Sequence, residues 1–233
     1  MQTTSKKNRN NLLFTDTTST FSEAFQHLQV NLNFSFIGEE NNILAITSPL
    51  AGEGKSTVTA NLAYIYAKKG YKVLVIDLDL RKPNIHRFFN LSNDKGITDY
   101  CAKEATVEEI INHFESIDII TAGTHTPLPG KVLESEILFD LINSLKVKYD
   151  YVLIDTPPVI LTSDAMICSK FAPSYLIVID YGKSKKSDFE EVIRQFKADS
   201  KINIAGVVMN KMKVTKTEYD YKYRYSYGKE NNK

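Results

Sequence analysis

The chain has 233 residues, of which 42% are hydrophobic and 24% charged, and these ordinary proportions predict one globular domain with a sizeable core. With 29 Lys and Arg against 28 Asp and Glu, the net charge is +1, so no bulk electrostatic attraction to nucleic acid or to a membrane surface is indicated. Cys101 and Cys168 form neither a disulfide framework nor a metal-ligand cluster, and no apolar run is long enough to span a bilayer. We therefore expect a cytoplasmic protein, unless a partner holds it at a membrane.

The first elements predicted along the chain are a helix, a strand and a second helix. Residues 1–19 are polar and are expected to form a flexible segment. Thr20, with Glu23 three residues later, is typical of a capping box, and apolar residues down to Leu32 then share one helical face. A short apolar strand is predicted at 43–47, followed by a helix at 56–69 that ends at Gly70.

Strands and helices alternate along the rest of the chain. Further strands are predicted at residues 72–77, 117–121, 151–155, 175–180 and 202–209. Helices are predicted at residues 106–114, 132–145, 164–171 and 187–197. This alternation predicts an α/β fold, with a doubly wound, mostly parallel sheet and helices on both faces. The expected organisation is one domain over residues 20–212, with a flexible C-terminal tail at 213–233.

The segment between the first strand and the second helix has the features of a phosphate loop, and it reads SPLAGEGKST over residues 48–57. Its glycines allow backbone N–H groups to surround phosphates, and the following helix N-terminus adds a favourable dipole. Lys55 is expected to reach the terminal phosphates and the Ser56 hydroxyl to bind Mg²⁺. Pro49 stands where the strict pattern has glycine, and the alternative interpretation is a glycine-rich turn beside a surface lysine. The residues expected to bind ATP here are Ala51, Gly52, Glu53, Gly54, Lys55, Ser56 and Thr57.

Two other strands end in aspartate at the edge of the sheet where α/β folds bind ligands. Asp77 ends one strand and is followed by Asp79, and Asp155 ends another. An aspartate in this position typically holds a hydrated Mg²⁺ beside the phosphate-loop hydroxyl. A spare carboxylate can serve as a base toward an incoming hydroxyl. Each of these aspartates, taken alone, is also a common loop or cap residue.

Together these motifs resemble the cytosolic kinase of the bacterial tyrosine kinase family, of the type that accompanies capsular and exopolysaccharide export. The resemblance runs from about residue 20 to the end of the chain. Residues 51–57 match Walker A, residues 73–83 match the second Walker motif, and residues 155–158 match Walker B. The stretch 206–210 and a tyrosine-rich tail complete the match.

The resemblance implies a P-loop kinase that uses ATP and Mg²⁺ to phosphorylate its own tail, mainly between subunits. As partners it implies a separate transmembrane adaptor of the polysaccharide co-polymerase type and a phosphotyrosine phosphatase. The adaptor would stimulate the kinase and recruit it to the inner face of the membrane, where it would regulate polysaccharide synthesis and export. The implied roles are phosphate binding and catalysis by Lys55, Mg²⁺ binding directly or through water by Ser56, Asp79 and Asp155, activation of the tyrosine hydroxyl by Asp77, a catalytic contribution from Asp79, and ATP contact by Asn210.

The first helix departs from the family pattern at the position that the resemblance assigns to the subunit interface. The family often carries Glu-x-x-Arg-x-x-Arg there, whereas this chain has Glu23, Gln26 and Gln29. Glutamine keeps hydrogen bonding but lacks the charge and the bidentate fork of arginine. The resemblance implies self-association into a ring of subunits. Without the two arginines, we expect this association to be weaker.

The C-terminal tail alternates tyrosine with polar residues, which predicts phosphoacceptors near a phosphoryl source. The same alternation is typical of a half-buried edge strand, and its interleaved basic residues are also typical of nucleic-acid or lipid contact. The lack of aliphatic residues after Val214 favours a flexible tail, and no nucleic-acid partner is expected. Each phosphotyrosine adds roughly −1.5 to −2 charges, so modification would act as a charge switch. The expected phosphoacceptors are Tyr219, Tyr221, Tyr223, Tyr225 and Tyr227.

The main alternative function is a dimeric switch ATPase of the chromosome-partition or division-site type, which shares the fold and the paired aspartates. Those proteins typically carry a lysine early in the phosphate loop, where this chain has Leu50. They also give no reason for a tyrosine-rich tail. A metallochaperone NTPase is disfavoured because the chain has no Cys/His cluster, and a non-catalytic scaffold that binds nucleotide is a third class.

Overall fold

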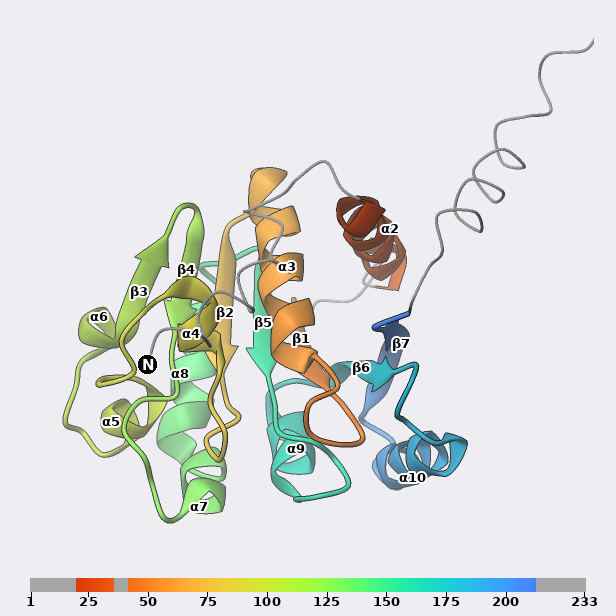
Figure 1. The fold of residues 1–233 in the computed structure, drawn as a ribbon. Coiled ribbons are helices and arrows are strands. Elements are labelled where there is room, and N and C mark those ends of the chain that lie inside the picture. Colours follow the sequence, from red (N-terminus) through yellow and green to blue (C-terminus); the bar gives the residue numbers. More distant parts are fainter. Residues whose placement is uncertain (1–19, 36–41, 213–233) are drawn as a thin grey trace, which may run out of the picture.

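The computed structural model describes residues 20–35 and 42–212, which fold around one 7-stranded sheet (Figure 1). The strands are β1 (Ile43–Thr47), β2 (Val73–Asp77), β3 (Ile111–Phe114), β4 (Ile117–Ile120), β5 (Tyr151–Asp155), β6 (Ser174–Asp180) and β7 (Asn203–Asn210). Their order in the sheet is β3-β4-β2-β5-β1-β6-β7, and every neighbouring pair is parallel except β3 with β4. The expected doubly wound, mostly parallel α/β fold is therefore confirmed.

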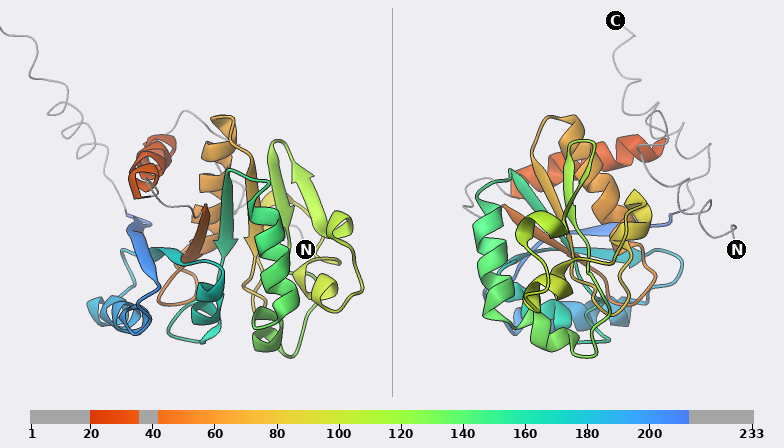
Figure 2. Two further views of the ribbon diagram at one scale, coloured as in Figure 1. Left: turned by 180° about the vertical axis from the view of Figure 1, so that it is seen from behind. Right: turned by 90° about the vertical axis from the view of Figure 1, so that its left-hand side faces the viewer.

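The helices lie on both faces of this sheet, as Figures 1 and 2 show for α2 and α3 on one face and α8 on the other. They are α2 (Thr20–Ser35), α3 (Lys55–Lys68), α4 (Ile85–Phe89), α5 (Ile97–Cys101), α6 (Val107–Ile110), α7 (Pro129–Leu133), α8 (Glu136–Lys146), α9 (Asp164–Ile167), the 3₁₀ helix η1 (Cys168–Lys170) and α10 (Lys186–Lys197). Among these described helices, none combines the length and the hydrophobicity that crossing a membrane requires.

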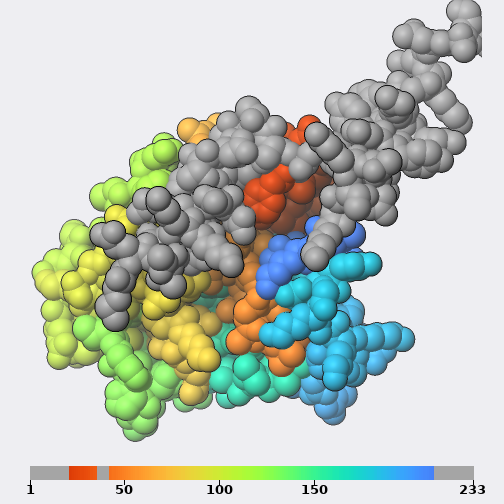
Figure 3. All heavy atoms as spheres, viewed as in Figure 1, coloured from red at the N-terminus to blue at the C-terminus, as the bar shows by residue number. Residues whose placement is uncertain are grey.

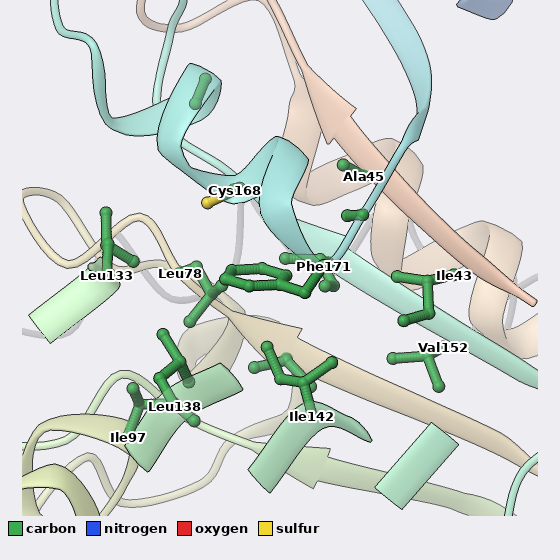
Figure 4. Packing of buried hydrophobic residues seen from close by; sticks show 14 of the residues in the cluster. Ile43, Ala45, Leu78, Ile97, Leu133, Leu138, Ile142, Val152, Cys168 and Phe171 are labelled. Carbon is green, nitrogen blue, oxygen red and sulfur yellow. The ribbon is translucent and has the colours of Figure 1, made fainter. Parts of the chain in front are cut away.

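The central strands are apolar on both sides because helices cover both faces of the sheet. In β1, Ile43 and Ala45 join the core on the α8 and α10 side, whereas Leu44 and Ile46 join the core on the α2 and α3 side. Figure 4 shows the first of these cores, where the ring of Phe171 lies beside Leu78. Two continuous cores thus hold the strands in place, one on each face of the sheet. The strands in turn position the loops at their carboxyl ends.

The helix predicted at 106–114 is wrong in its second half. Its capping box is present, since Thr106 Oγ1 accepts from the Glu109 N–H at 3.4 Å and Glu109 Oε2 accepts from the Thr106 N–H at 2.9 Å. The helix ends at Ile110, and residues 111–114 form β3, paired antiparallel with β4 through a turn at Glu115. Pairing with a neighbouring strand outweighs the helical spacing of these few apolar residues.

Two other predicted helices are interrupted. The helix predicted at 132–145 is divided into α7 and α8, because Ser135 Oγ accepts from the Leu138 N–H at 3.3 Å and starts a new helix. The helix predicted at 164–171 is a short α9 followed by the 3₁₀ helix η1, which places Cys168 in the core. Helices α4 and α5 had no predicted counterpart.

Three predictions lie wholly outside the described residues. They are the N-terminal segment 1–19, the tail 213–233, and with that tail all five candidate phosphoacceptor tyrosines. They remain predictions from the sequence.

Packing in the core on the α10 side predicts that removal of the Phe196 ring greatly lowers the stability of the protein. Phe196 is 1% exposed and packs on Tyr175 with ring centroids 4.8 Å apart. Replacing Phe196 with Ala should lower the free energy of unfolding by about 3–5 kcal/mol, because a cavity remains in a close-packed core. Urea denaturation measures the change. The matched control is Phe34→Ala, since Phe34 is 68% exposed and should change stability by less than about 0.5 kcal/mol; equal effects of the two variants would contradict the assignment of this core.

Candidate active site

The phosphate loop joins β1 to α3, and its glycines have the conformations that such a loop needs. Gly52 and Gly54 have φ angles of 83° and 102°, which residues other than glycine rarely adopt. A Cβ atom on Gly54 would lie 2.1 Å from Asn210 Nδ2, at the end of β7. Backbone conformation therefore favours glycine at residue 54, and a side chain there would also displace the Asn210 amide.

Glu53 is a phosphate-loop residue whose side chain points into the protein, where it is 0% exposed. One carboxylate oxygen accepts from the Leu50 N–H at 3.0 Å, and the other accepts from the Ser184 hydroxyl in the β6–α10 connection. Glu53 therefore ties the loop to the rest of the domain. Its expected part in ATP binding can come only from its backbone N–H in this conformation.

Lys55 is buried and paired with Asp79, whose Oδ2 lies 3.1 Å from the ammonium group. Burial alone would lower the pKa of Lys55, but the charges of Asp155 and Asp79 outweigh it and raise the pKa above its usual value. Lys55 therefore keeps its positive charge at neutral pH. The other oxygen of Asp79 accepts from the Lys82 N–H at 3.1 Å.

Asp155 lies at the end of β5, next to the first turn of α3. Its Oδ2 accepts from the Ser56 hydroxyl at 2.5 Å, whereas its buried Oδ1 has no partner among the described residues. Burial raises the pKa of Asp155 to about 6, although Lys55 and the Ser56 hydrogen bond counteract part of this shift. An orphaned carboxylate oxygen beside a hydroxyl is suited to bind a hard cation.

Asp77 is fully buried in the strand next to Asp155, since the two residues are aligned across β2 and β5. Its Oδ2 accepts from the N–H groups of Asn84 and Ile85 at 2.9 and 3.0 Å, and its Oδ1 accepts from the Asp79 N–H at 3.2 Å. Burial and the charge of Asp155 raise the pKa of Asp77 well above its usual value, despite these hydrogen bonds. Asp77 therefore fixes the segment that follows β2 in this conformation.

The residues predicted to bind nucleotide and metal lie together at the carboxyl ends of parallel strands. The phosphate loop follows β1, Asp77 ends β2 and is followed by Asp79, Asp155 ends β5, and Asn210 ends β7 and donates to the Glu53 carbonyl at 2.8 Å. Thr57 lies half-buried in the first turn of α3. In Figure 3 the orange segment that contains the loop borders the cyan and blue segments of β6, α10 and β7.

Several residues around the site were not predicted. Lys211 contacts the phosphate loop and Asp180, and Arg81 forms a bidentate pair with buried Asp164 at 2.6 and 3.2 Å. Asp180 ends an apolar strand exactly as Asp77 and Asp155 do, so a sequence signal for it existed. Lys211 carried no such signal, because its role depends on β7 lying beside the loop.

The residues of this site are suited to Mg²⁺ that is bound together with a nucleotide. They are less suited to a metal ion that is held by protein ligands alone. Among the described residues, no group of three or more His, Cys, Asp and Glu side chains is arranged to hold a metal ion. Mg²⁺ is usually held by one or two carboxylates together with phosphate oxygens and water, which agrees with Ser56 and Asp155 beside the loop. Ser56 and Asp155 would hold the ion, which would neutralise charge on the phosphates.

Comparisons of the sequence identify close relatives. Residues 41–205 match the family model described as an AAA domain. The chain is 34% identical to the tyrosine-protein kinase YwqD of Bacillus subtilis (strain 168), over 98% of this chain and 95% of that protein. It is 35% identical to the putative tyrosine-protein kinase CapB of Staphylococcus aureus, over 85% and 87% of the two chains.

Solved structures show the same fold. The chimerical protein CapA2B2 matches with a TM-score of 0.82 and 32% identity, over 88% of this chain and 91% of that one. The septum site-determining protein MinD of Pyrococcus horikoshii OT3, complexed with Mg-ADP, matches with a TM-score of 0.62 and 28% identity, over 75% and 72%. Of these two structures, the CapA2B2 chimera is the better match.

The raised pKa of Asp155 predicts an unusual pH dependence of stability. Its pKa is about 6 in the folded protein and 3.8 in ordinary surroundings, so between these values the folded state binds more protons than the unfolded state. Stability contributed by Asp155 is thus greatest below pH 4 and is lost as pH rises to about 6. Relative to Asp155→Asn, the nucleotide-free protein should lose stability over this window.

Urea denaturation of both proteins from pH 4 to 7.5, with a chelator present, measures this difference. Adding Mg²⁺ and ADP at pH 7.5 should then stabilise the original protein and not the variant. A difference between the two proteins that stays constant, or that changes in the opposite direction, would show that Asp155 is not destabilised by its burial.

Proposed function

The chain belongs to the bacterial tyrosine kinase family, and on that premise we propose that it transfers the γ-phosphoryl group of ATP to tyrosines of its own C-terminal tail. The chain matches two relatives named as tyrosine-protein kinases over most of their length, and tyrosine-protein kinase activity is the activity of this chain. The proposal adds the acceptor, the direction of transfer between neighbouring copies, and regulation of capsular or exopolysaccharide synthesis and export.

The observation that carries the proposal is the arrangement of Lys55, Ser56 and Asp155 at the mouth of the phosphate loop. Phosphoryl transfer requires mainly positioning and electrostatic stabilisation of the transferred group. Lys55 supplies a positive charge that its aspartate neighbours preserve. Ser56 and Asp155 supply the oxygen ligands for Mg²⁺, and one oxygen of Asp155 has no partner within residues 20–35 and 42–212.

We assign the remaining roles to the two aspartates that follow β2. Asp79 holds the Lys55 ammonium in place and contributes to the Mg²⁺ environment through water. Asp77 serves as the base for the tyrosine hydroxyl, and burial and the charge of Asp155 raise its pKa, which makes it a stronger proton acceptor than an ordinary carboxylate. Because its oxygens accept N–H groups of Asn84 and Ile85, this role requires movement of the segment that follows β2.

The proposed acceptors are Tyr219, Tyr221, Tyr223, Tyr225 and Tyr227, which follow β7 in the sequence. Five phosphate groups would add on the order of −8 to −10 charges to a tail that also carries lysines and an arginine. A modified tail would then be repelled by the buried aspartates, while an unmodified tail would not. Phosphorylation would therefore release the tail from the active site of a neighbouring copy.

We also propose a cytoplasmic kinase that a separate transmembrane adaptor recruits to the inner face of the membrane, and a phosphotyrosine phosphatase that resets the tail. The match to a protein described as a chimera, CapA2B2, supports a second chain as the natural partner. The relative named CapB and the Klebsiella pneumoniae relative described as lying in a cps region support the link to polysaccharide export.

A switch ATPase of the division-site type is the second candidate, because MinD shares the fold. In this chain Leu50 occupies the loop position where those ATPases typically have lysine. Its N–H is bound by the buried Glu53 carboxylate, and its apolar side chain cannot supply the positive charge of such a lysine. Family membership and the loop both favour the kinase.

Incubation of the protein with ATP and Mg²⁺, with and without an adaptor segment, tests the proposal. Phosphotyrosine mapped by mass spectrometry should fall on the tail, and Lys55→Met should lose it by at least about 100-fold, since phosphate binding and charge stabilisation are both removed. The control is a chain with all five tail tyrosines changed to Phe, which should still hydrolyse ATP. Hydrolysis of ATP with an unmodified tail under every condition would exclude the kinase and favour the switch ATPase.

Helix α2 carries the positions that the resemblance assigns to self-association, and its two glutamines differ in their exposure to solvent. Gln26 is exposed, whereas Gln29 is 1% exposed and its side-chain oxygen accepts from Lys69 at the end of α3. The expectation that Gln29 faces a neighbouring subunit is therefore wrong, because it attaches α2 to its own domain. Only Glu23 and Gln26 remain as exposed positions of the family pattern.

This difference predicts opposite results for two arginine substitutions. Gln29→Arg would bury a cation beside the ammonium group of Lys69 and should lower the free energy of unfolding by at least about 2 kcal/mol. Gln26→Arg should change stability by less than about 0.5 kcal/mol and should strengthen self-association. Urea denaturation and sedimentation velocity measure the two effects. A fully stable Gln29→Arg protein would refute the buried contact, and unchanged association of Gln26→Arg would exclude this face as the interface.

A further inference from the structure

We propose that Lys211 and Asn210, at the end of β7, are positioning residues that hold the phosphate loop in the conformation required to bind nucleotide phosphates. This inference rests on the proposed function only in requiring that the loop binds nucleotide. It assigns Lys211 a role that the phosphate-loop motif does not contain.

Three consecutive carbonyl groups of the loop are contacted by side chains from β7 and from the connection after β6. Lys211 Nζ donates to the Gly52 carbonyl at 2.6 Å, and Asn210 Nδ2 donates to the Glu53 carbonyl at 2.8 Å. The exposed Lys183 approaches the Ala51 carbonyl at 3.5 Å, which is a weaker contact. We call these three side chains the carbonyl clamp.

The carbonyl clamp determines the direction of the backbone N–H groups that follow each carbonyl. In a planar trans peptide the C=O group and the next N–H group point in opposite directions, and the described residues contain no cis peptide. Holding the carbonyls of Gly52 and Glu53 toward β7 therefore turns the N–H groups of Glu53 and Gly54 away from it. Within the described part of the chain these N–H groups have no acceptor, so they are available to phosphate oxygens.

Lys211 is itself held by a buried carboxylate. Its Nζ lies 2.7 Å from Asp180 Oδ2, and Asp180 also accepts from the Gly182 N–H at 3.1 Å. The hydrogen bond from Lys211 is the main reason that the pKa of Asp180 is lowered. Lys211 has a φ angle of 59°, a conformation that is costly for a residue other than glycine and that persists only where surrounding contacts impose it.

The same contacts connect the nucleotide site to the tail. Lys211 lies two residues before residue 213, where the segment that contains the five tyrosines begins. The carbonyl clamp is therefore close in sequence to this segment. A side chain that shapes the phosphate site is thus adjacent in sequence to the proposed substrate.

The affinity for Mg²⁺-ADP, measured by isothermal titration calorimetry well below the unfolding temperature, tests the proposal. Lys211→Met should weaken binding by roughly tenfold or more, because a charged hydrogen bond to the loop is lost. Lys211→Arg should restore most of the affinity, and Lys183→Met should cause a smaller loss. The matched control is Lys186→Met, since Lys186 is exposed and pairs only with Glu190 in the described structure.

The readouts distinguish positioning from general destabilisation and from failure of the proposed function. Thermal unfolding of the nucleotide-free proteins should show that Lys211→Met remains folded at the temperature of the titration. Affinity of Lys211→Met equal to that of the original protein would overturn the carbonyl clamp while leaving the kinase intact. Absence of nucleotide binding by the original protein would overturn both.

Discussion

A single buried cation, Lys55, lies among three buried carboxylates at the carboxyl ends of β2 and β5, and the rest of the site depends on this arrangement. Burial disfavours each charge taken alone, so every charge must be compensated by a partner or by hydrogen bonds. Lys55 retains its proton because the aspartates surround it. One ammonium group cannot balance three carboxylates, however, and the excess negative charge is the physical reason that a divalent cation is suited to this site.

The hydrogen bonds of the three aspartates show how the nucleotide-free protein tolerates that excess. Asp77 is satisfied by backbone N–H groups and Asp79 by Lys55 and Lys82, whereas one oxygen of Asp155 has no partner in the part of the chain that the structure describes. The raised pKa values of Asp77 and Asp155 measure the remaining cost. Perturbed groups of this kind concentrate at functional sites, because stability alone does not favour them.

Most of this site was predictable because its signals are local. A glycine-rich loop after a strand, and strands that end in aspartate, place Lys55, Asp77 and Asp155 together in any parallel sheet. What was not predictable depends on contacts between distant segments. Gln29 was assigned to an outer surface, although its burial against Lys69 follows from how α2 packs on α3. The strand β3 was taken for helix because its four residues acquire their conformation from β4, and Lys211 carried no motif at all.

The origin of the cation beside the phosphate loop distinguishes this chain from the switch ATPases that share its fold. There a lysine early in the loop is expected to reach the nucleotide of a partner, whereas here Leu50 takes that position and Glu53 binds its N–H inside the domain. The cation beside the Gly52 carbonyl comes instead from Lys211 of the same chain. A loop completed in this way does not need a second subunit to shape its phosphate site. Association between copies is then free to serve another purpose, and presentation of a tyrosine-rich tail to a neighbour is such a purpose.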